Sequence, residues 1–188
     1  MGVLALQGAF REHAEALRAL DADVVLVKRP EHLAGIDGIV LPGGESTTMD
    51  KLLDWSDLRA PLTEALHGGL PAFATCAGLI LLASELVDGR PDQRPLGVLD
   101  MTVRRNGYGR QRESFESALD IADLPGGTFR GVFIRAPKVE RTGPAVEVLA
   151  EHEGIAVYGR QDRIFFSSFH PELSGDLRLH ELFLREVS

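Results

Sequence analysis

The stretch Phe73-Ala74-Thr75-Cys76-Ala77-Gly78-Leu79 contains the only cysteine of the 188-residue chain and predicts a tight turn between a strand and a helix. Residues 70–74 are short and apolar, as in a buried strand, and residues 78–86 predict a mostly buried helix. Such a turn presents one side chain above the end of a sheet, where the helix N-terminus favours a thiolate. A lone cysteine is more often a small buried apolar residue, so the nucleophile hypothesis needs support from elsewhere in the chain.

Composition restricts the class of protein. The formal net charge is −8, and 44% of residues are hydrophobic and 26% charged. Length and composition predict one globular domain over residues 1–188. The acidic balance argues against a nucleic-acid partner and against binding to anionic membranes. One cysteine cannot form an internal disulfide, and the chain lacks a spanning apolar run and a signal-peptide pattern, so we expect a cytoplasmic protein.

The first half of the chain alternates between predicted strands and helices. Strands are expected over residues 2–6, 23–27, 38–41 and 71–74, and helices over residues 11–20, 47–53 and 57–67. In the first helix, alanines and leucines form one face and Glu12, His13 and Arg18 the other. This alternation predicts an α/β fold with three layers, in which a mostly parallel sheet carries helices on both faces.

The second half predicts mainly strands. They are expected over residues 100–104, 115–119, 128–134, 145–150, 155–158 and 164–168, followed by a closing helix over residues 176–186. We expect this half to complete the central sheet and to add a small antiparallel flap.

Polar segments follow several predicted strands and should meet at one rim, because ligands bind beyond the carboxyl ends of parallel strands. Cys76, His170 and Glu172 could act as nucleophile, base and orienting acceptor. Pro171 has a fixed φ, which allows both of its neighbours to point toward one site. The His-x-Glu pair alone also fits a surface pair or a zinc site with Cys76, although the Pro-Cys-x-x-Cys element of zinc deaminases is missing.

A glycine-rich segment, residues 41–48, follows another predicted strand. Backbone N–H groups at Gly43 and Gly44, together with that of Ala77, could stabilise an oxyanion formed by attack on an amide. The same segment also predicts a turn in which Ser46 or Thr47 caps the next helix. It lacks the Gly-x4-Gly-Lys-Ser/Thr pattern of a phosphate-binding loop.

Six ordered blocks carry a resemblance to a known family. They are residues 2–13 (GVLALQGAFREH), 41–49 (LPGGESTTM), 75–79 (TCAGL), 105–111 (RNGYGRQ), 131–137 (GVFIRAP) and 168–173 (SFHPEL). The chain resembles the class I, triad-type glutamine amidotransferases of flavodoxin-like fold, and within them the glutaminase subunits of pyridoxal 5'-phosphate synthases. The turn around Cys76, which is called the nucleophile elbow, and the His-Pro-Glu sequence are typical of the superfamily. The first, second and fifth blocks are typical of the vitamin B6 branch.

The resemblance implies hydrolysis of glutamine to glutamate and ammonia by Cys76, His170 and Glu172, without a cofactor or metal. It places the glutamine-binding positions on Gly44, Glu45, Ser46, Arg105, Ile134 and Arg135. It also implies a hetero-oligomeric complex with a barrel synthase subunit, which receives the ammonia and makes pyridoxal 5'-phosphate from a pentose phosphate and a triose phosphate. Gln7 and Gly8 are candidates for the step in which docking of that partner completes the oxyanion hole.

The chain departs from the family pattern at two places. Ala74 replaces the first glycine of the usual Gly-x-Cys-x-Gly elbow, and residues 106–109 carry a glycine where relatives often have serine. Two rival functions remain open at this point. One is a glutaminase that feeds histidine, purine or aminobenzoate synthesis. The other is a non-catalytic binding or chaperone-like relative in which Cys76 is a redox sensor.

Overall fold

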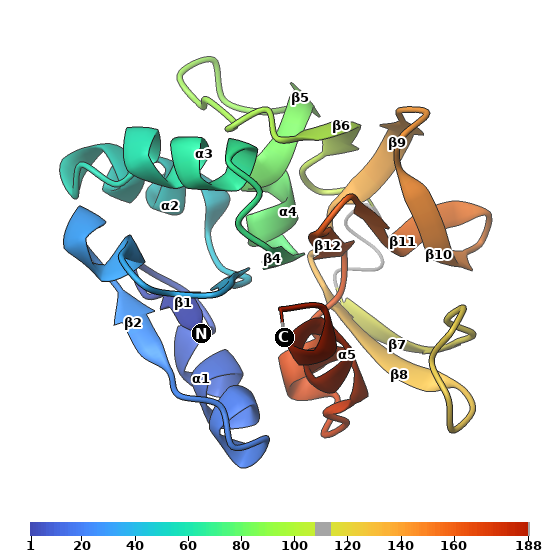
Figure 1. The fold of residues 1–188 in the computed structure, drawn as a ribbon. Coiled ribbons are helices and arrows are strands. Elements are labelled where there is room, and N and C mark those ends of the chain that lie inside the picture. The colour runs from blue at the N-terminus through green and yellow to red at the C-terminus, as the bar shows by residue number, and fades with distance from the viewer. Residues whose placement is uncertain (108–113, 188) are drawn as a thin grey trace.

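The computed structural model describes residues 1–107 and 114–187 (Figure 1). Its central sheet has seven strands in the order β10-β11-β12-β4-β3-β1-β2. Five neighbouring strands are parallel: β12 (Ile164–Ser167), β4 (Ala72–Thr75), β3 (Ile39–Leu41), β1 (Gly2–Leu4) and β2 (Val25–Val27). At one edge, β11 (Ile155–Gln161) and β10 (Glu147–His152) add antiparallel pairings. The predicted α/β class with a mostly parallel sheet is confirmed.

Helices cover both faces of this sheet (Figure 1). One face carries α2 (Ser46–Trp55), α3 (Arg59–His67) and α4 (Ala77–Leu82), and the other carries α1 (Phe10–Ala19) and α5 (Arg178–Val187). Successive residues of β4 serve opposite cores, because side chains alternate along a strand: Ala72 and Ala74 lie in the leucine-rich core, and Phe73 lies in the aromatic core with Phe183. No helix in the described ranges is long and apolar enough to cross a bilayer.

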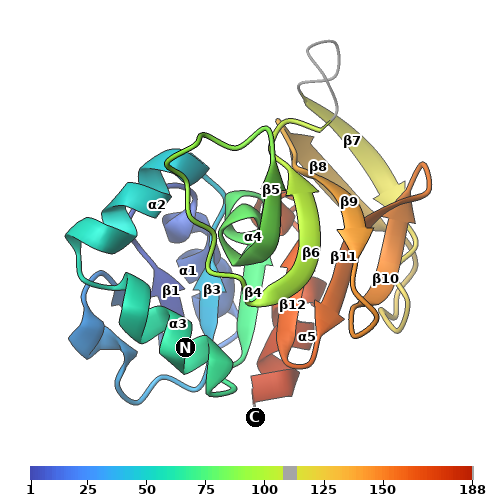
Figure 2. The same ribbon diagram turned by 90° about the horizontal axis from the view of Figure 1, so that it is seen from above.

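Residues 83–142 add two smaller sheets. One contains β5 (Ala83–Val87), β6 (Leu99–Arg104) and β9 (Lys138–Thr142), and the other pairs β7 (Ser114–Leu119) with β8 (Phe129–Ile134) (Figure 2). The β7–β8 and β6–β9 pairs are antiparallel, but β5 and β6 are parallel, so the expected antiparallel flap is only partly correct. Strand β9 was not predicted, nor was the 3-10 turn η1 (Pro30–Leu33).

The predicted helix over residues 78–86 is wrong in its second half, because α4 ends at Leu82 and β5 begins at Ala83. The carbonyls of residues 81–83 accept hydrogen bonds from N–H groups of residues 96–98. The Ser84 hydroxyl donates to Met101 O at 3.0 Å and accepts from Met101 N at 3.1 Å. These bonds between distant segments replace the backbone bonds that a longer helix would form. The apolar composition of residues 78–86 gives no indication of them.

Close contact between α4 and β3 requires a glycine in the helix. A Cβ atom at Gly78 would lie 2.2 Å from the carbonyl oxygen of Leu41, which is backbone and cannot move aside. The Ala74 methyl group, by contrast, is fully buried in the leucine-rich core between β3 and β12, where Ala74 pairs with Leu41 and Phe166. The departure at Ala74 is thus accommodated, whereas the second glycine of the elbow is sterically required.

The first prediction concerns that contact. Gly78→Ala will lower the free energy of unfolding by about 1–3 kcal/mol or more, since the helix must move away from β3. Denaturant unfolding measures the change. Gly68→Ala is the matched control, because Gly68 is exposed with φ −74° at the end of α3, and the nearest atom to an added Cβ would be Glu64 O at 3.1 Å instead of 2.2 Å. Equal stability of the two variants would contradict the steric argument.

Candidate active site

Four adjacent strands of the sheet, β1, β3, β4 and β12, run parallel, so the segments that follow them meet at one rim. Cys76 follows β4, the glycine-rich segment follows β3, and Gln7-Gly8 follows β1 by two residues. His170 and Glu172 follow β12, and Glu172 lies in the short 3-10 turn η3 (Pro171–Leu173). The structure therefore brings together the residues that the sequence analysis placed at strand ends.

Cys76 occupies the turn between β4 and α4 in a strained conformation. Its φ is +48°, a left-handed value that side chains other than glycine rarely adopt, and this strain is held by surrounding bonds. The Cys76 N–H donates to Ser167 O at 2.8 Å, which joins the turn to β12. The residue is 6% exposed, and its Sγ lies 4.0 Å from the carbonyl oxygen of Ile134. The predicted elbow is present.

His170 and Glu172 form a close buried pair. His170 Nδ1 lies 2.7 Å from Glu172 Oε1, and the side chains are 10% and 0% exposed. With Nδ1 occupied by the carboxylate, Nε2 is the nitrogen left for the thiol of Cys76, whose proximity favours the charged form of His170. This order of contacts matches the nucleophile, base and orienting acceptor of a triad.

The electrostatics of the pair favour an imidazolium and a carboxylate. Burial opposes the charged form of His170, but its hydrogen bonds to Cys76 and Glu172 outweigh burial and raise the pKa of His170 to about 10. Burial also raises the pKa of Glu172, but contacts with His13 and His170 outweigh it and hold that pKa well below its usual range. The site thus keeps a proton on His170 at neutral pH.

The glycine-rich segment lies against both the triad and the end of β1. A Cβ atom at Gly43 would approach His170 Cε1 to 2.4 Å and Cys76 Cβ to 3.3 Å, so glycine lets this backbone reach the reacting groups. On its other side, Gly43 O accepts a hydrogen bond from the N–H of Ala9 at 3.0 Å. A Cβ atom at Gly8, where φ is +92°, would lie 1.9 Å from the same Gly43 oxygen.

Gln7 and Glu45 extend this contact. Gln7 Oε1 accepts a hydrogen bond from Glu45 N at 2.7 Å and lies close to Gly44. The Glu45 side chain, and not Ser46 or Thr47 as expected, caps α2 by accepting bonds from Thr47 N and Thr47 Oγ1. Ser46 is the first residue of the helix and is 3% exposed. Ala77, the first residue of α4, directly follows the thiol.

Charged groups line the site beside the cap. Arg105 Nη2 lies 3.0 Å from Glu45 Oε1, and the arginine side chain is 18% exposed. Among the described residues, the buried Nε of Arg105 has no hydrogen-bond partner. Burial raises the pKa of Glu45, but the Thr47 hydrogen bonds and the charges of Arg105 and Arg135 lower it overall. Arg135 follows Ile134 and has φ +43°. Of the sequence block that begins at Arg105, residues 108–111 lie outside the described ranges.

Two buried histidines behind the triad were not predicted. The sequence analysis placed His13 on the polar face of its helix, but His13 is fully buried and lies 3.3 Å from Glu172 Oε2. His180, from α5, is also fully buried and contacts His13 at 2.8 Å. Leu17 lies one helical turn after His13, on the buried stripe of α1. This spacing is the sequence signal that could have indicated the burial of His13.

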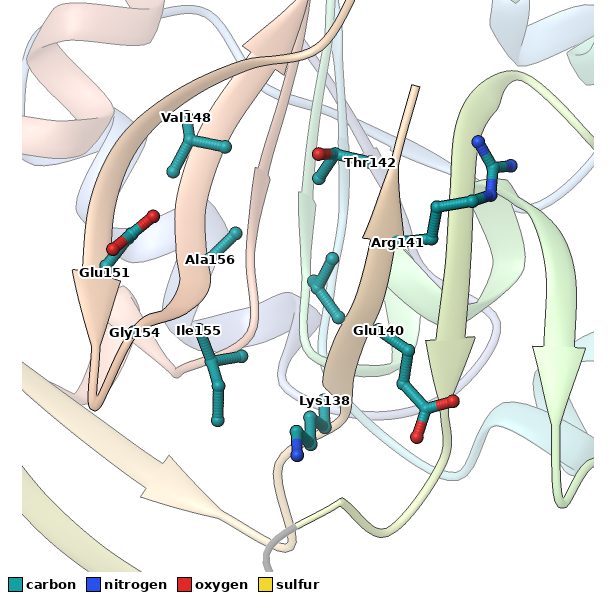
Figure 3. A pocket seen from close by; sticks show the side chains of 10 residues that line it. Lys138, Glu140, Arg141, Thr142, Val148, Glu151, Gly154, Ile155 and Ala156 are labelled. Atoms are coloured by element: carbon teal, nitrogen blue, oxygen red, sulfur yellow. The ribbon is translucent and has the colours of Figure 1, made fainter. Parts of the chain in front are cut away.

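A groove of about 540 Å³ lies away from this rim, between β9 and the β10–β11 hairpin (Figure 3). Its lining includes Lys138, Glu140, Glu151 and Ile155, and no residue of the triad. In the part of the chain that the structure describes, no group of three or more His, Cys, Asp or Glu side chains is arranged to hold a metal ion.

Comparisons with known sequences identify relatives over the whole chain. A family model described as the SNO glutamine amidotransferase family matches residues 3–188. The pyridoxal 5'-phosphate synthase subunit PdxT of Rhodococcus jostii (strain RHA1) is 55% identical over 191 residues, which cover 98% of this chain and 95% of that protein. The PdxT subunit of Thermotoga neapolitana is 51% identical over 187 residues, which cover 100% of this chain and 98% of that protein.

Solved structures agree as well. One described as a crystal structure of glutamine amidotransferase superposes with a TM-score of 0.93 and 49% identity, covering 99% of this chain and 97% of that chain. The structure of PurLQS from Thermotoga maritima has a TM-score of 0.68, covering 100% and 97% of the two chains. At 14% identity, that second likeness concerns the fold alone.

The second prediction concerns the proton on His170. A histidine whose pKa rises from about 6.5 in the unfolded chain to about 10 in the folded protein stabilises the fold fully below pH 6.5. This stabilisation is lost as pH rises toward 10, with a slope of at most about 1.4 kcal/mol per pH unit. Denaturant unfolding between pH 7 and 10 should therefore show a steeper loss in the wild type than in His170→Asn.

The exposed His67, at the end of α3, supplies the control for this measurement. His67→Asn should keep the wild-type slope, since the contacts of His170 remain. Parallel stability curves for wild type and His170→Asn over this range would show that the imidazolium is not held by the site.

Proposed function

Because the chain belongs to the SNO glutamine amidotransferase family, we propose that Cys76, His170 and Glu172 hydrolyse glutamine to glutamate and ammonia for a pyridoxal 5'-phosphate synthase. The observation that carries the proposal is the strained Cys76 turn facing the buried His170–Glu172 pair. A non-catalytic protein in which Cys76 is a redox sensor would not need the buried His170–Glu172 pair.

The reaction proceeds in two halves. The Cys76 thiolate attacks the side-chain carbonyl carbon of glutamine, and the C–N bond breaks as His170 gives its proton to the leaving nitrogen. Ammonia departs and leaves a thioester on Cys76. His170 then takes a proton from the water that attacks the thioester, the C–S bond breaks, and Cys76 leaves as the thiolate beside the protonated His170, while the new carboxyl group of glutamate loses its proton to solvent. Glu172 holds the ring of His170 and stabilises its charged form throughout.

Each half of the reaction places negative charge on the carbonyl oxygen. The N–H groups of Gly44 and Ala77 are the proposed donors, since Gly43 approaches Cys76 and Ala77 follows it. The trans Gly43–Gly44 peptide turns its carbonyl toward Ala9, so the N–H of Gly44 points the opposite way. Fixed donors of this kind are worth about 10²–10³ in rate each.

Arg105 and Glu45 are the proposed partners for the two charged groups of the amino acid. The guanidinium fits the substrate carboxylate and the Glu45 carboxylate fits the ammonium, with backbone groups at Gly44, Ser46, Ile134 and Arg135 completing the pocket. The buried Nε of Arg105 supports this assignment, because it has no hydrogen-bond partner among residues 1–107 and 114–187 and a buried donor without a partner is costly.

The proposed partner is a barrel synthase subunit that takes ammonia directly from this site, in a cytoplasmic complex. Gln7 and Gly8 pack on the Gly43–Gly44 peptide. This packing supports control of the oxyanion hole by that partner, since a displacement of Gln7 or Gly8 on docking is transmitted to the oxyanion donors. Glutamine would then be hydrolysed slowly by the free subunit and faster in the complex. A glutaminase for histidine, purine or aminobenzoate synthesis is less favoured, because the relatives at 51–55% identity are PdxT subunits.

The third prediction tests both the chemistry and the partner. Glutamate release from glutamine should rise strongly when a pyridoxal 5'-phosphate synthase barrel subunit is added. Cys76→Ala should lower that activity by about 10⁴-fold or more while the variant still folds and binds the partner, and Glu172→Gln should cost less. Co-purification and circular dichroism serve as the controls for binding and folding.

Two results would contradict the proposal in different ways. Full activity without stimulation keeps the glutaminase and removes the proposed partner. Activity retained by Cys76→Ala excludes Cys76 as the nucleophile.

The fourth prediction concerns substrate binding. Arg105→Lys should raise the KM for glutamine about tenfold, equivalent to about 1.4 kcal/mol, with a smaller effect on kcat, since lysine cannot reproduce the planar fork. Arg104→Lys is the matched control, because Arg104 pairs instead with Asp88 and Glu140. Equal KM values for the two variants would remove Arg105 from the substrate pocket.

A further inference from the structure

A chain of buried polar contacts continues beyond the triad. Glu172 uses one carboxylate oxygen, Oε1, for His170 at 2.7 Å. Its second oxygen, Oε2, is fully buried, has no hydrogen bond among the described residues and lies 3.3 Å from Nε2 of His13. The side chains of Glu172 and His13 are both 0% exposed, so water does not screen this contact.

His13 is itself held by two further elements. Its Nδ1 lies 2.8 Å from Nε2 of His180, and the two rings are 5.1 Å apart at 51°. Its Nε2 lies 3.1 Å from Thr75 Oγ1, on the residue before the nucleophile. Burial, together with the neighbouring His13, lowers the pKa of His180 to about 3, so His180 is uncharged at neutral pH.

We propose that His13 is a positioning residue for the triad: its Nε2–H holds the second oxygen of Glu172, and His180 fixes the His13 ring. The inference rests on the proposed glutaminase function and extends the Cys76–His170–Glu172 order by two residues from α1 and α5. His13 does not touch substrate. It acts by keeping the Glu172 carboxylate ionised and oriented toward His170.

The physical need for such a group follows from burial. A buried carboxylate is costly unless its oxygens are paired, because the low local dielectric favours the neutral acid. The titratable groups that face Glu172 are His170 on one oxygen and His13 on the other, and those that face His13 are Glu172 and His180. Without His13, burial will raise the pKa of Glu172, and the acidic limb of the pH–rate profile will move to higher pH.

The competing arrangement is purely structural. If Thr75 Oγ1 donates to His13 Nε2, that nitrogen carries no proton and His13 only fills space behind the site. The two arrangements differ in the tautomer of His13, which can be observed directly.

The fifth prediction uses two substitutions of similar shape. His13→Gln keeps an N–H group near the position of Nε2, and His13→Met has a similar length without a donor. In the complex with the synthase subunit, His13→Met should lower kcat about tenfold at an unchanged KM, and shift the acidic limb upward by about one pH unit. His13→Gln should recover most of kcat and the wild-type pH profile.

A second readout does not depend on glutamine or on the partner. Cys76 is the only cysteine in the chain, so its alkylation by iodoacetamide reports the reactivity of this thiol alone. The pH profile of alkylation should move upward in His13→Met and stay near wild type in His13→Gln. This result supports the positioning role even if glutamine is not the substrate, which separates failure of this inference from failure of the proposed function.

Three outcomes overturn the inference. Wild-type kinetics and alkylation in His13→Met show that the contact is unimportant, and equal losses in both variants show a packing role. The third outcome needs no substitution: ¹⁵N NMR of the unsubstituted protein at pH 7 should find His13 Nε2 protonated. An unprotonated Nε2 excludes His13 as a donor to Glu172.

Discussion

The left-handed turn at Cys76 is the constraint on which the site depends. Its φ of +48° is maintained by the hydrogen bond from Cys76 N to Ser167 O, and by the close seating of Gly78 on the Leu41 carbonyl. Both supports come from neighbouring parallel strands. The strand that holds the thiol in place is also the strand that His170 follows, so the positions of the Cys76 thiol and the His170 imidazole are set by one pairing.

Much of this arrangement could be predicted because its signals are local. Short apolar runs separated by helical patterns indicate a parallel sheet, and the order of strands then brings their carboxyl ends to one rim. The elbow at Cys76, the His170–Glu172 pair and the glycine-rich segment could each be placed at a strand end from sequence alone. Their mutual contacts follow from the strand order β1-β3-β4-β12.

The parts that could not be predicted depend on bonds between distant segments. Strand β5 continues an apolar run, and only the bonds from residues 96–98 show why α4 stops at Leu82. The sequence predicts that Glu45 binds substrate. The same side chain also caps α2, and no distinct sequence signal indicates that contact. His13 was assigned to the polar face by residue type, but its position one turn from Leu17 places it in the interior. The single-domain organisation stays a prediction.

The order of the elements along the chain has a consequence for biosynthesis. The thiol is translated well before β12, and the residues around Glu172 come from both the first helix and the last. A ribosome-bound chain that ends within β11 carries Cys76 but neither His170 nor Glu172. Under the proposed mechanism, hydrolysis of glutamine begins only when translation has passed η3, so shorter chains on the polysome do not consume glutamine.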